Sequence, residues 1–222
     1  YRTFKTIVII MSIFKRILYI LPFVILQCSC LNLFPNKNKD IYTATVTLQK
    51  EGDTPYFITD DNNIILTTTE KIDDYTHKIG NRFFISYTIS TQYSETQIEI
   101  SVNSIIELKN SDIITSDYTT NKNTYCIPKM VWFSGNHLNC IFTAAITDIN
   151  KHDFIMILKG IESNTLSLEV IHTNDNDSES VNRDFAFTYD IQEYIKEYNI
   201  QNISLVYQDL YKGKETISIK IQ

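Results

Sequence analysis

Apolar and polar residues alternate with a period of two over much of the chain beyond residue 41. In residues 42–49, tyrosine, alanine, valine and leucine alternate with three threonines and a glutamine. Such alternation is typical of a β-strand with one buried face. Five strand-like segments in about 70 residues predict a small barrel, because closure removes exposed sheet edges. The expected strands are 42–49, 56–59, 64–68, 83–91 and 98–108, with a β-bulge at 104–106.

The second half of the chain predicts a β-sandwich with one helix. Asp190 is the expected helix cap, and Glu193 completes a capping box. Apolar residues spaced i, i+3, i+4, i+7 from Ile191 form one stripe, and the helix ends within 199–202. The seven expected strands are 125–133, 137–147, 154–158, 166–172, 184–189, 203–210 and 216–221.

Two polar stretches without a clear period separate these parts. Residues 30–40 contain Pro, Asn and Lys and suit a tether. Residues 110–124 are rich in Ser, Thr, Asp and Asn and mark a domain boundary. We therefore predict an all-β chain (mainly), with a five-stranded barrel at 41–109, a linker at 110–124 and a sandwich at 125–222.

The N-terminal residues predict an export signal that ends at a lipid-bearing cysteine. Lys15 and Arg16 precede a ten-residue apolar run, which is too short to span a bilayer because spanning takes about 20 residues. We therefore predict that residues 1–29 comprise an upstream extension, residues 1–10, and a lipoprotein signal peptide that starts at Met11. Two alternatives stay open, namely a retained signal anchor and ordinary cleavage without lipid.

Two cysteines compete for the lipid. Cys30 follows Ser29, a small residue of the kind that the signal peptidase accepts at the cut, whereas Cys28 follows the bulkier Gln27. We predict lipidation at Cys30, with Cys28 as the alternative. The membrane is then a partner of this protein through its N-terminal lipid.

Net charge argues against nucleic acid as a partner. Residues 1–29 hold four basic side chains and no acidic one, so the remainder has 16 basic and 26 acidic side chains. The barrel region has five basic against ten acidic residues. Nucleic-acid binding depends on clustered Lys and Arg, so we expect no nucleic-acid binding.

Cys126 and Cys140 are predicted to be free core thiols. If 134–136 turns a hairpin, Met130 faces Cys140 and Cys126 lies four residues further along its strand. At ~3.3 Å per residue the two cysteines are about 13 Å apart, beyond the roughly 7 Å Cα limit of a disulfide.

Three features of the sequence resemble the NigD-like lipoproteins of Bacteroidota. They are the segment Trp132-Phe133-Ser134-Gly135-Asn136-His137-Leu138-Asn139, the strand at 184–190 that leads into a helix, and the two strands that follow this helix. The resemblance covers about residues 30–222. It implies an N-terminal OB-like barrel, a C-terminal β-sandwich and a lipid anchor. The family name comes from a bacteriocin-immunity context. Surface-exported lipoproteins of this group carry acidic residues soon after the lipid cysteine, and 31–39 has none, so we expect a periplasm-facing protein.

No motif predicts catalysis, a metal or a cofactor: Walker loop, GxGxxG, HExxH, GxSxG and CxxC are all missing from the sequence. Residues 173–179 resemble the start of a calcium loop, but Ser180 and Ala186 occupy the positions that need Gly and Glu. His172 is in phase with apolar strand residues, which favours a half-buried sheet histidine over a ligand.

Aromatic residues around the 134–136 turn are the candidate partner-binding surface. Trp132, Phe133 and His137 form this candidate site, since Trp and Tyr are favoured interface anchors. The plainer interpretation, which we favour for Trp132, is a place in the sandwich core. The sequence thus predicts a lipid-anchored, non-enzymatic envelope protein that binds a protein or glycan. The alternatives are a bacteriocin-immunity-type lipoprotein and an envelope hydrolase with an unrecognised site.

Overall fold

The computed structural model describes residues 40–68, 73–115, 123–178 and 180–221. The expected signal peptide, most of the expected tether and both candidate lipid cysteines lie outside these residues. Among the described residues, no helix is long and apolar enough to cross a membrane.

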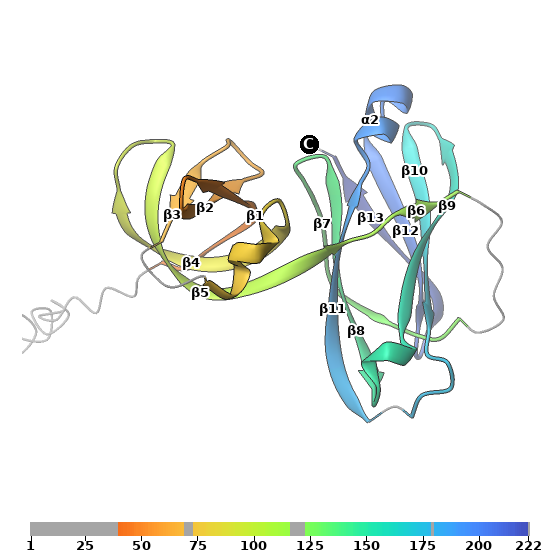
Figure 1. Cartoon of the computed structure of the whole chain (residues 1–222). Coiled ribbons are helices and arrows are strands. Elements are labelled where there is room, and N and C mark those ends of the chain that lie inside the picture. The colour runs from red at the N-terminus through yellow and green to blue at the C-terminus, as the bar shows by residue number, and fades with distance from the viewer. Residues whose placement is uncertain (1–39, 69–72, 116–122, 179, 222) are drawn as a thin grey trace, which may run out of the picture. The chain divides into compact units, whose positions relative to one another are not determined.

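The N-terminal domain is the five-stranded barrel that the alternation predicts. Its strands follow the order β3-β2-β1-β4-β5, and β3 also pairs in parallel with β5, which closes the sheet (Figure 1). Phe57, Phe83 and Ile85 are fully buried in its core. The strands are β1 (Tyr42–Glu51), β2 (Thr54–Thr59), β3 (Ile65–Thr67), β4 (Arg82–Gln92) and β5 (Gln97–Asn110), with a 3-10 helix η1 (Asp73–Lys78) before β4.

Strand β5 contains the predicted β-bulge, which lies one residue earlier than the sequence pattern indicates. Ser86 of β4 pairs with Ser104, whereas the next residue, Tyr87, pairs with Val102, so Asn103 is the extra residue. A bulge increases the local twist of a strand, which helps a five-stranded sheet to close.

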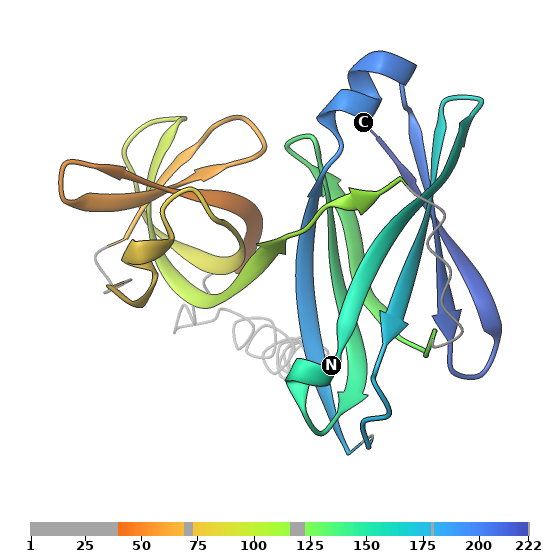
Figure 2. The ribbon, with the colours of Figure 1, turned by 45° about the vertical axis from the view of Figure 1, so that its right-hand side comes forward.

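The C-terminal domain is a sandwich of two sheets (Figures 1 and 2). One sheet has the order β13-β12-β10-β9-β6, and the other is formed by β11, β8 and β7 together with the end of β5. The elements are β6 (Ile113–Ile114), β7 (Ile127–Ser134), β8 (His137–Ile146), η2 (Ile149–Lys151), β9 (Asp153–Glu162), β10 (Thr165–Thr173), β11 (Val181–Asp190), α2 (Gln192–Tyr198), β12 (Asn202–Asp209) and β13 (Gly213–Lys220).

Strand β5 belongs to both domains. Its last residues, Lys109 and Asn110, pair in parallel with Phe187 and Thr188 of β11. Just beyond it, β6 pairs with β9 in the opposite sheet, so the segment expected to be a linker contributes a strand to the sandwich. The path of the chain from the barrel into the sandwich is therefore fixed by backbone hydrogen bonds.

The β7–β8 hairpin differs from the predicted register by one residue. Its turn has two residues, Gly135 and Asn136, both with positive φ (53° and 65°), as a type I′ turn requires. Ser134 consequently pairs with His137, and Cys140 faces Val131 rather than Met130.

Both cysteines are free and buried, as predicted, although Cys126 does not lie along β7 as expected. Its N–H donates to the Gln208 carbonyl of β12, so the chain turns to the opposite sheet before β7 begins. Burial raises the pKa of the Cys126 thiol to about 12 and also raises that of Cys140.

Helix α2 forms where the apolar stripe predicts it, but it begins at Gln192 and has Ile191 at its N-cap. The Asp190 carboxylate still accepts the Gln192 N–H at 2.9 Å. Ile191 is fully buried, whereas Tyr198 at the end of the stripe is 44% exposed. Asn199 ends the helix in the left-handed conformation, at the predicted boundary.

A closed ring of side-chain hydrogen bonds joins the two domains. Arg82 of β4 binds Asp60 of the β2–β3 turn through two contacts of 2.9 and 2.5 Å, and both side chains are less than 8% exposed. Arg82 Nε donates to Thr188, which donates to Asn139. Asn139 donates to Ser134, whose hydroxyl returns to Asp60 at 2.7 Å. Every member of the ring thereby has a polar partner.

The hairpin turn and Trp132 complete this domain contact. Gly135 lies so near the ion pair that a Cβ atom there would be 2.7 Å from Asp60 Cγ. The Trp132 indole donates to Thr45 of β1 at 2.8 Å, and its ring packs on Phe84 of β4 with centroids 5.1 Å apart. The expectation that Trp132 sits in the sandwich core is therefore wrong, because the indole faces the barrel.

Asp60→Ala leaves the Arg82 guanidinium buried without a counter-charge, so we expect the free energy of unfolding to fall by about 3–5 kcal/mol. The matched control is Asp61→Ala, which removes the exposed neighbouring carboxylate and should change stability by less than ~0.5 kcal/mol. Urea unfolding of both variants measures the difference. Equal stability of the two variants would contradict the importance of the ion pair.

Candidate functional site

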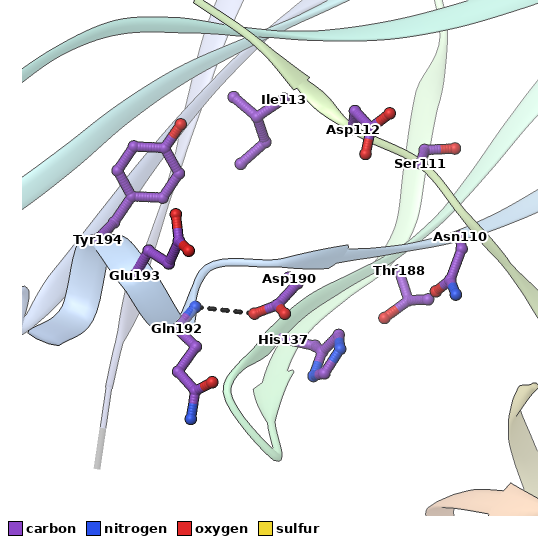
Figure 3. Close-up of a pocket in the computed structure, with 10 residues that line it drawn as sticks. All are labelled: Asn110, Ser111, Asp112, Ile113, His137, Thr188, Asp190, Gln192, Glu193 and Tyr194. Carbon is purple, nitrogen blue, oxygen red and sulfur yellow. Dashed lines mark hydrogen bonds between the residues drawn. The ribbon is translucent and has the colours of Figure 1, made fainter. Parts of the chain in front are cut away.

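A cavity of about 780 Å³ lies where three parts of the C-terminal domain meet (Figure 3). Its walls come from the β5–β6 connection, from the facing ends of β8 and β11, and from the first turn of α2. The lining residues are Asn110, Ser111, Asp112, Ile113, His137, Thr188, Asp190, Gln192, Glu193 and Tyr194.

Backbone hydrogen bonds hold these walls in place. The Ser111 N–H donates to the Thr188 carbonyl at 3.1 Å, which fixes the β5–β6 connection on β11. The Ile191 N–H donates to the Asn136 carbonyl at 3.1 Å, which fixes the start of α2 on the β7–β8 turn. Each wall is thus anchored to regular structure even though most lining residues lie at element ends.

Three carboxylates give the cavity a set of charged hydrogen-bond acceptors. The carboxylates of Asp112, Asp190 and Glu193 are all exposed to solvent. His137 Nδ1 lies 2.6 Å from the Gly135 carbonyl, so this nitrogen carries a proton and leaves Nε2 as an acceptor in the neutral ring. With the Tyr194 hydroxyl beside them, these groups suit a ligand that presents hydroxyl or amine donors.

The structure separates the three candidate partner-binding residues. His137 lines the cavity. Phe133 is half-buried and packs against the sandwich core, and Trp132 contacts the barrel. The sequence reasoning missed Asp112 and Asn110, because a polar linker carries no periodic signal, and it treated Asp190 as a helix cap only.

The histidines that stand apart in the sequence are not all separate in space. His172 is 2% exposed rather than half-buried, and its ring contacts that of His152. Asp177, in the segment that resembles a calcium loop, accepts hydrogen bonds from backbone N–H groups of residues 147 and 148. Within the described ranges, no group of three or more His, Cys, Asp or Glu is arranged to hold a metal.

These features define a two-domain β protein with an OB barrel, a sandwich that shares one strand with it, and a polar cavity at the end of the sandwich. Residues 43–108 match the NigD-like N-terminal OB domain, and residues 104–221 match the NigD-like C-terminal β-sandwich domain. The chain belongs to the NigD-like family. No curated protein matches it.

Solved structures share this fold at low sequence identity. A protein of unknown function from Bacteroides vulgatus has a TM-score of 0.68 at 17% identity, and the match covers 82% of this chain and 92% of that one. A NigD-like immunity protein from Bacteroides caccae has a TM-score of 0.58 at 18% identity, covering 81% and 91%. At these identities the likeness establishes the fold alone.

Proposed function

We propose that this chain is a lipid-anchored, non-enzymatic envelope protein that binds a protein or glycan partner in the polar cavity of its sandwich. The cavity itself is the observation that carries this proposal. Its volume of about 780 Å³ falls in the range of ligand sites, about 300–1,000 Å³. Small-molecule sites are mostly apolar, whereas this one is lined by carboxylates, amides and hydroxyls, which favours a polar partner.

The chemistry of the cavity supports binding over catalysis. A hydrolase of the Ser–His type needs a base held against a nucleophile and oriented by a third group. His137 is instead oriented by the Gly135 carbonyl of its own turn. The envelope-hydrolase alternative would require convergence of His137 with a hydroxyl or carboxylate on binding.

The barrel is proposed to have no nucleic-acid partner. Lys78 and Arg82 form ion pairs with Glu107 and Asp60, and Lys50 lies 3.4 Å from Asp53. A nucleic-acid-binding OB fold needs free basic groups along a groove with stacking aromatics. These neutralised cations, in a domain with twice as many acids as bases, disfavour a phosphate backbone.

Immunity to a toxin is the second candidate function, and one observation favours it. The structure from Bacteroides caccae that shares this fold is called a NigD-like immunity protein. An immunity role requires that cells expressing this chain survive a cognate toxin that kills cells without it. A general binding role predicts no such protection.

Charge reversal in the cavity tests the proposed site. Glu193→Lys and Asp112→Lys each place a cation where the cavity presents acceptors. In cross-linking experiments with envelope extract, we expect each variant to recover at least tenfold less of the partner than the wild-type protein does. Glu197→Lys is the matched control, because Glu197 is exposed on the same helix and does not line the cavity.

Peptide and glycan mass spectrometry of the cross-linked fraction identifies the class of partner. Equal recovery from Glu193→Lys and Glu197→Lys would place the partner elsewhere on the protein. If the wild type enriches nothing over a chain-free control, the binding role itself is wrong.

Lipid anchoring depends on one thiol, so Cys30→Ala should abolish incorporation of labelled palmitate and release the protein from the membrane fraction. Cys28→Ala is the matched control and should retain both label and membrane. The opposite result would assign the lipid to Cys28. Protease digestion of the protein on intact cells would contradict the proposed periplasm-facing orientation.

A further inference from the structure

The sandwich has one side on which two strand edges are only partly covered. Strand β5 pairs with β11 only at Phe187 and Thr188, although β11 begins at Val181. Strand β6 pairs with β9 only at Met156 and Ile157, and the β5–β6 connection crosses this side between the two sheets (Figure 1). Among the described strands, none covers the rest of either edge here. An uncovered edge is a template for pairing with another strand.

The observed pairing identifies the backbone groups on the open edge of β11. The Ser111 N–H donates to the Thr188 carbonyl, so the backbone groups of Thr188 face β5. Alternate residues of a strand direct their N–H and C=O groups to the same side. Asn182 and Asp184 therefore direct their backbone groups to the open edge, and both residues are exposed. The other edge of β11 pairs with β8 along its whole length.

Residues of both strands line a cavity of about 250 Å³ beside these open edges. Its aromatic lining consists of Phe154 from β9 and Phe185 and Phe187 from β11. The Phe154 ring centroid lies 4.8 Å from that of Phe185 and 5.3 Å from that of Phe187. Small-molecule sites have volumes of about 300–1,000 Å³, so this cavity suits one side chain rather than a whole ligand. The aromatic lining favours an apolar side chain.

Charged side chains beside the cavity restrict the partner further. Lys109 lines the cavity from β5, and Asp153 lines it from β9. Arg183 is exposed and lies two residues before Phe185, on the same face of β11. A strand added along this edge would place one of its side chains opposite Arg183. Opposite charges on facing strands attract and like charges repel, so an acidic side chain fits this position.

We propose that the open edge of β11 is a docking site for an extended segment of a protein partner, which places one apolar side chain in the aromatic cavity. A polypeptide fits because its backbone supplies a matching row of N–H and C=O groups. Side chains alternate between the faces of a strand, so an acidic residue two positions from the apolar one lies opposite Arg183. The added strand continues the edge pairing that β5 begins on β11.

A synthetic peptide tests this inference with the full chain purified in nonionic detergent. The probe is acetyl-Ser-Thr-Asp-Thr-Leu-Thr-Asp-Thr-Ser-amide, whose sequence is symmetric about Leu and can therefore pair in either direction. An NMR titration should give a Kd below ~1 mM. Replacing the peptide's Leu with Ser leaves the cavity unfilled and should weaken binding at least tenfold.

A charge exchange tests the role of Arg183. Arg183→Glu should bind a peptide with Lys in place of both Asp residues more tightly than the original peptide, which reverses the wild-type preference. Lys220→Glu is the matched control, because Lys220 is exposed on β13, and it should keep the wild-type preference. An unchanged preference in Arg183→Glu would contradict pairing along this edge.

Hydrogen exchange locates the peptide without any variant. The backbone amides of Asn182 and Asp184 should exchange rapidly in the chain alone and slowly when the peptide is bound. Protection of both amides in the chain alone would assign the edge to another part of this protein. A wild-type dimer in analytical ultracentrifugation that Arg183→Glu dissociates would assign it to a second copy. Either result would overturn the proposal.

Failure of this proposal can be told apart from failure of the proposed function. A Kd above ~1 mM for the original peptide, or equal binding of its Leu and Ser forms, would overturn the docking site alone. Ser111 borders both cavities, whereas Glu193 lines only the polar one. Glu193→Lys should therefore leave peptide binding unchanged while it reduces recovery of the partner of the polar cavity.

Discussion

The buried ion pair between Arg82 and Asp60 is the interaction on which the rest of this structure depends. Two charges removed from water cost several kcal/mol each, and they are tolerated only when geometry and additional hydrogen bonds satisfy both. The barrel supplies the charges, and the sandwich supplies the neutral partners Ser134, Asn139 and Thr188. Because the ring closes only when both domains are present, its formation couples their folding.

The same junction positions the polar cavity. Thr188 belongs to the ring and also lines the cavity, and it pairs with Asn110 at the end of β5. The β5–β6 connection that forms one wall is therefore placed by the strand that leaves the barrel. In this account the barrel is a support that orients the end of the sandwich where the polar cavity lies.

Much of the fold could be predicted from the sequence, because period-two alternation reports one buried face along each strand. The junction could not be predicted in this way. Asp60 sits in an Asp-Asp-Asn-Asn turn and Arg82 at a strand start, positions where exposed charges are ordinary. The sandwich partners of Arg82 are 57 and 106 residues away from it along the chain, and the partner of Asp60 is 74 residues away. The hairpin register was missed by one residue because Ser134 was counted in the turn, whereas the positive φ angles of Gly135 and Asn136 show a turn of these two residues alone.

Scanning calorimetry of the full chain tests the coupling of the two domains most directly. If the Arg82–Asp60 ring and the shared strand β5 make residues 40–221 one cooperative unit, the wild type unfolds in a single transition whose calorimetric and van't Hoff enthalpies agree. Arg82→Met, which removes the charge that closes the ring, should then split this transition into two. Two separate transitions in the wild type, one for the barrel and one for the sandwich, would contradict the account.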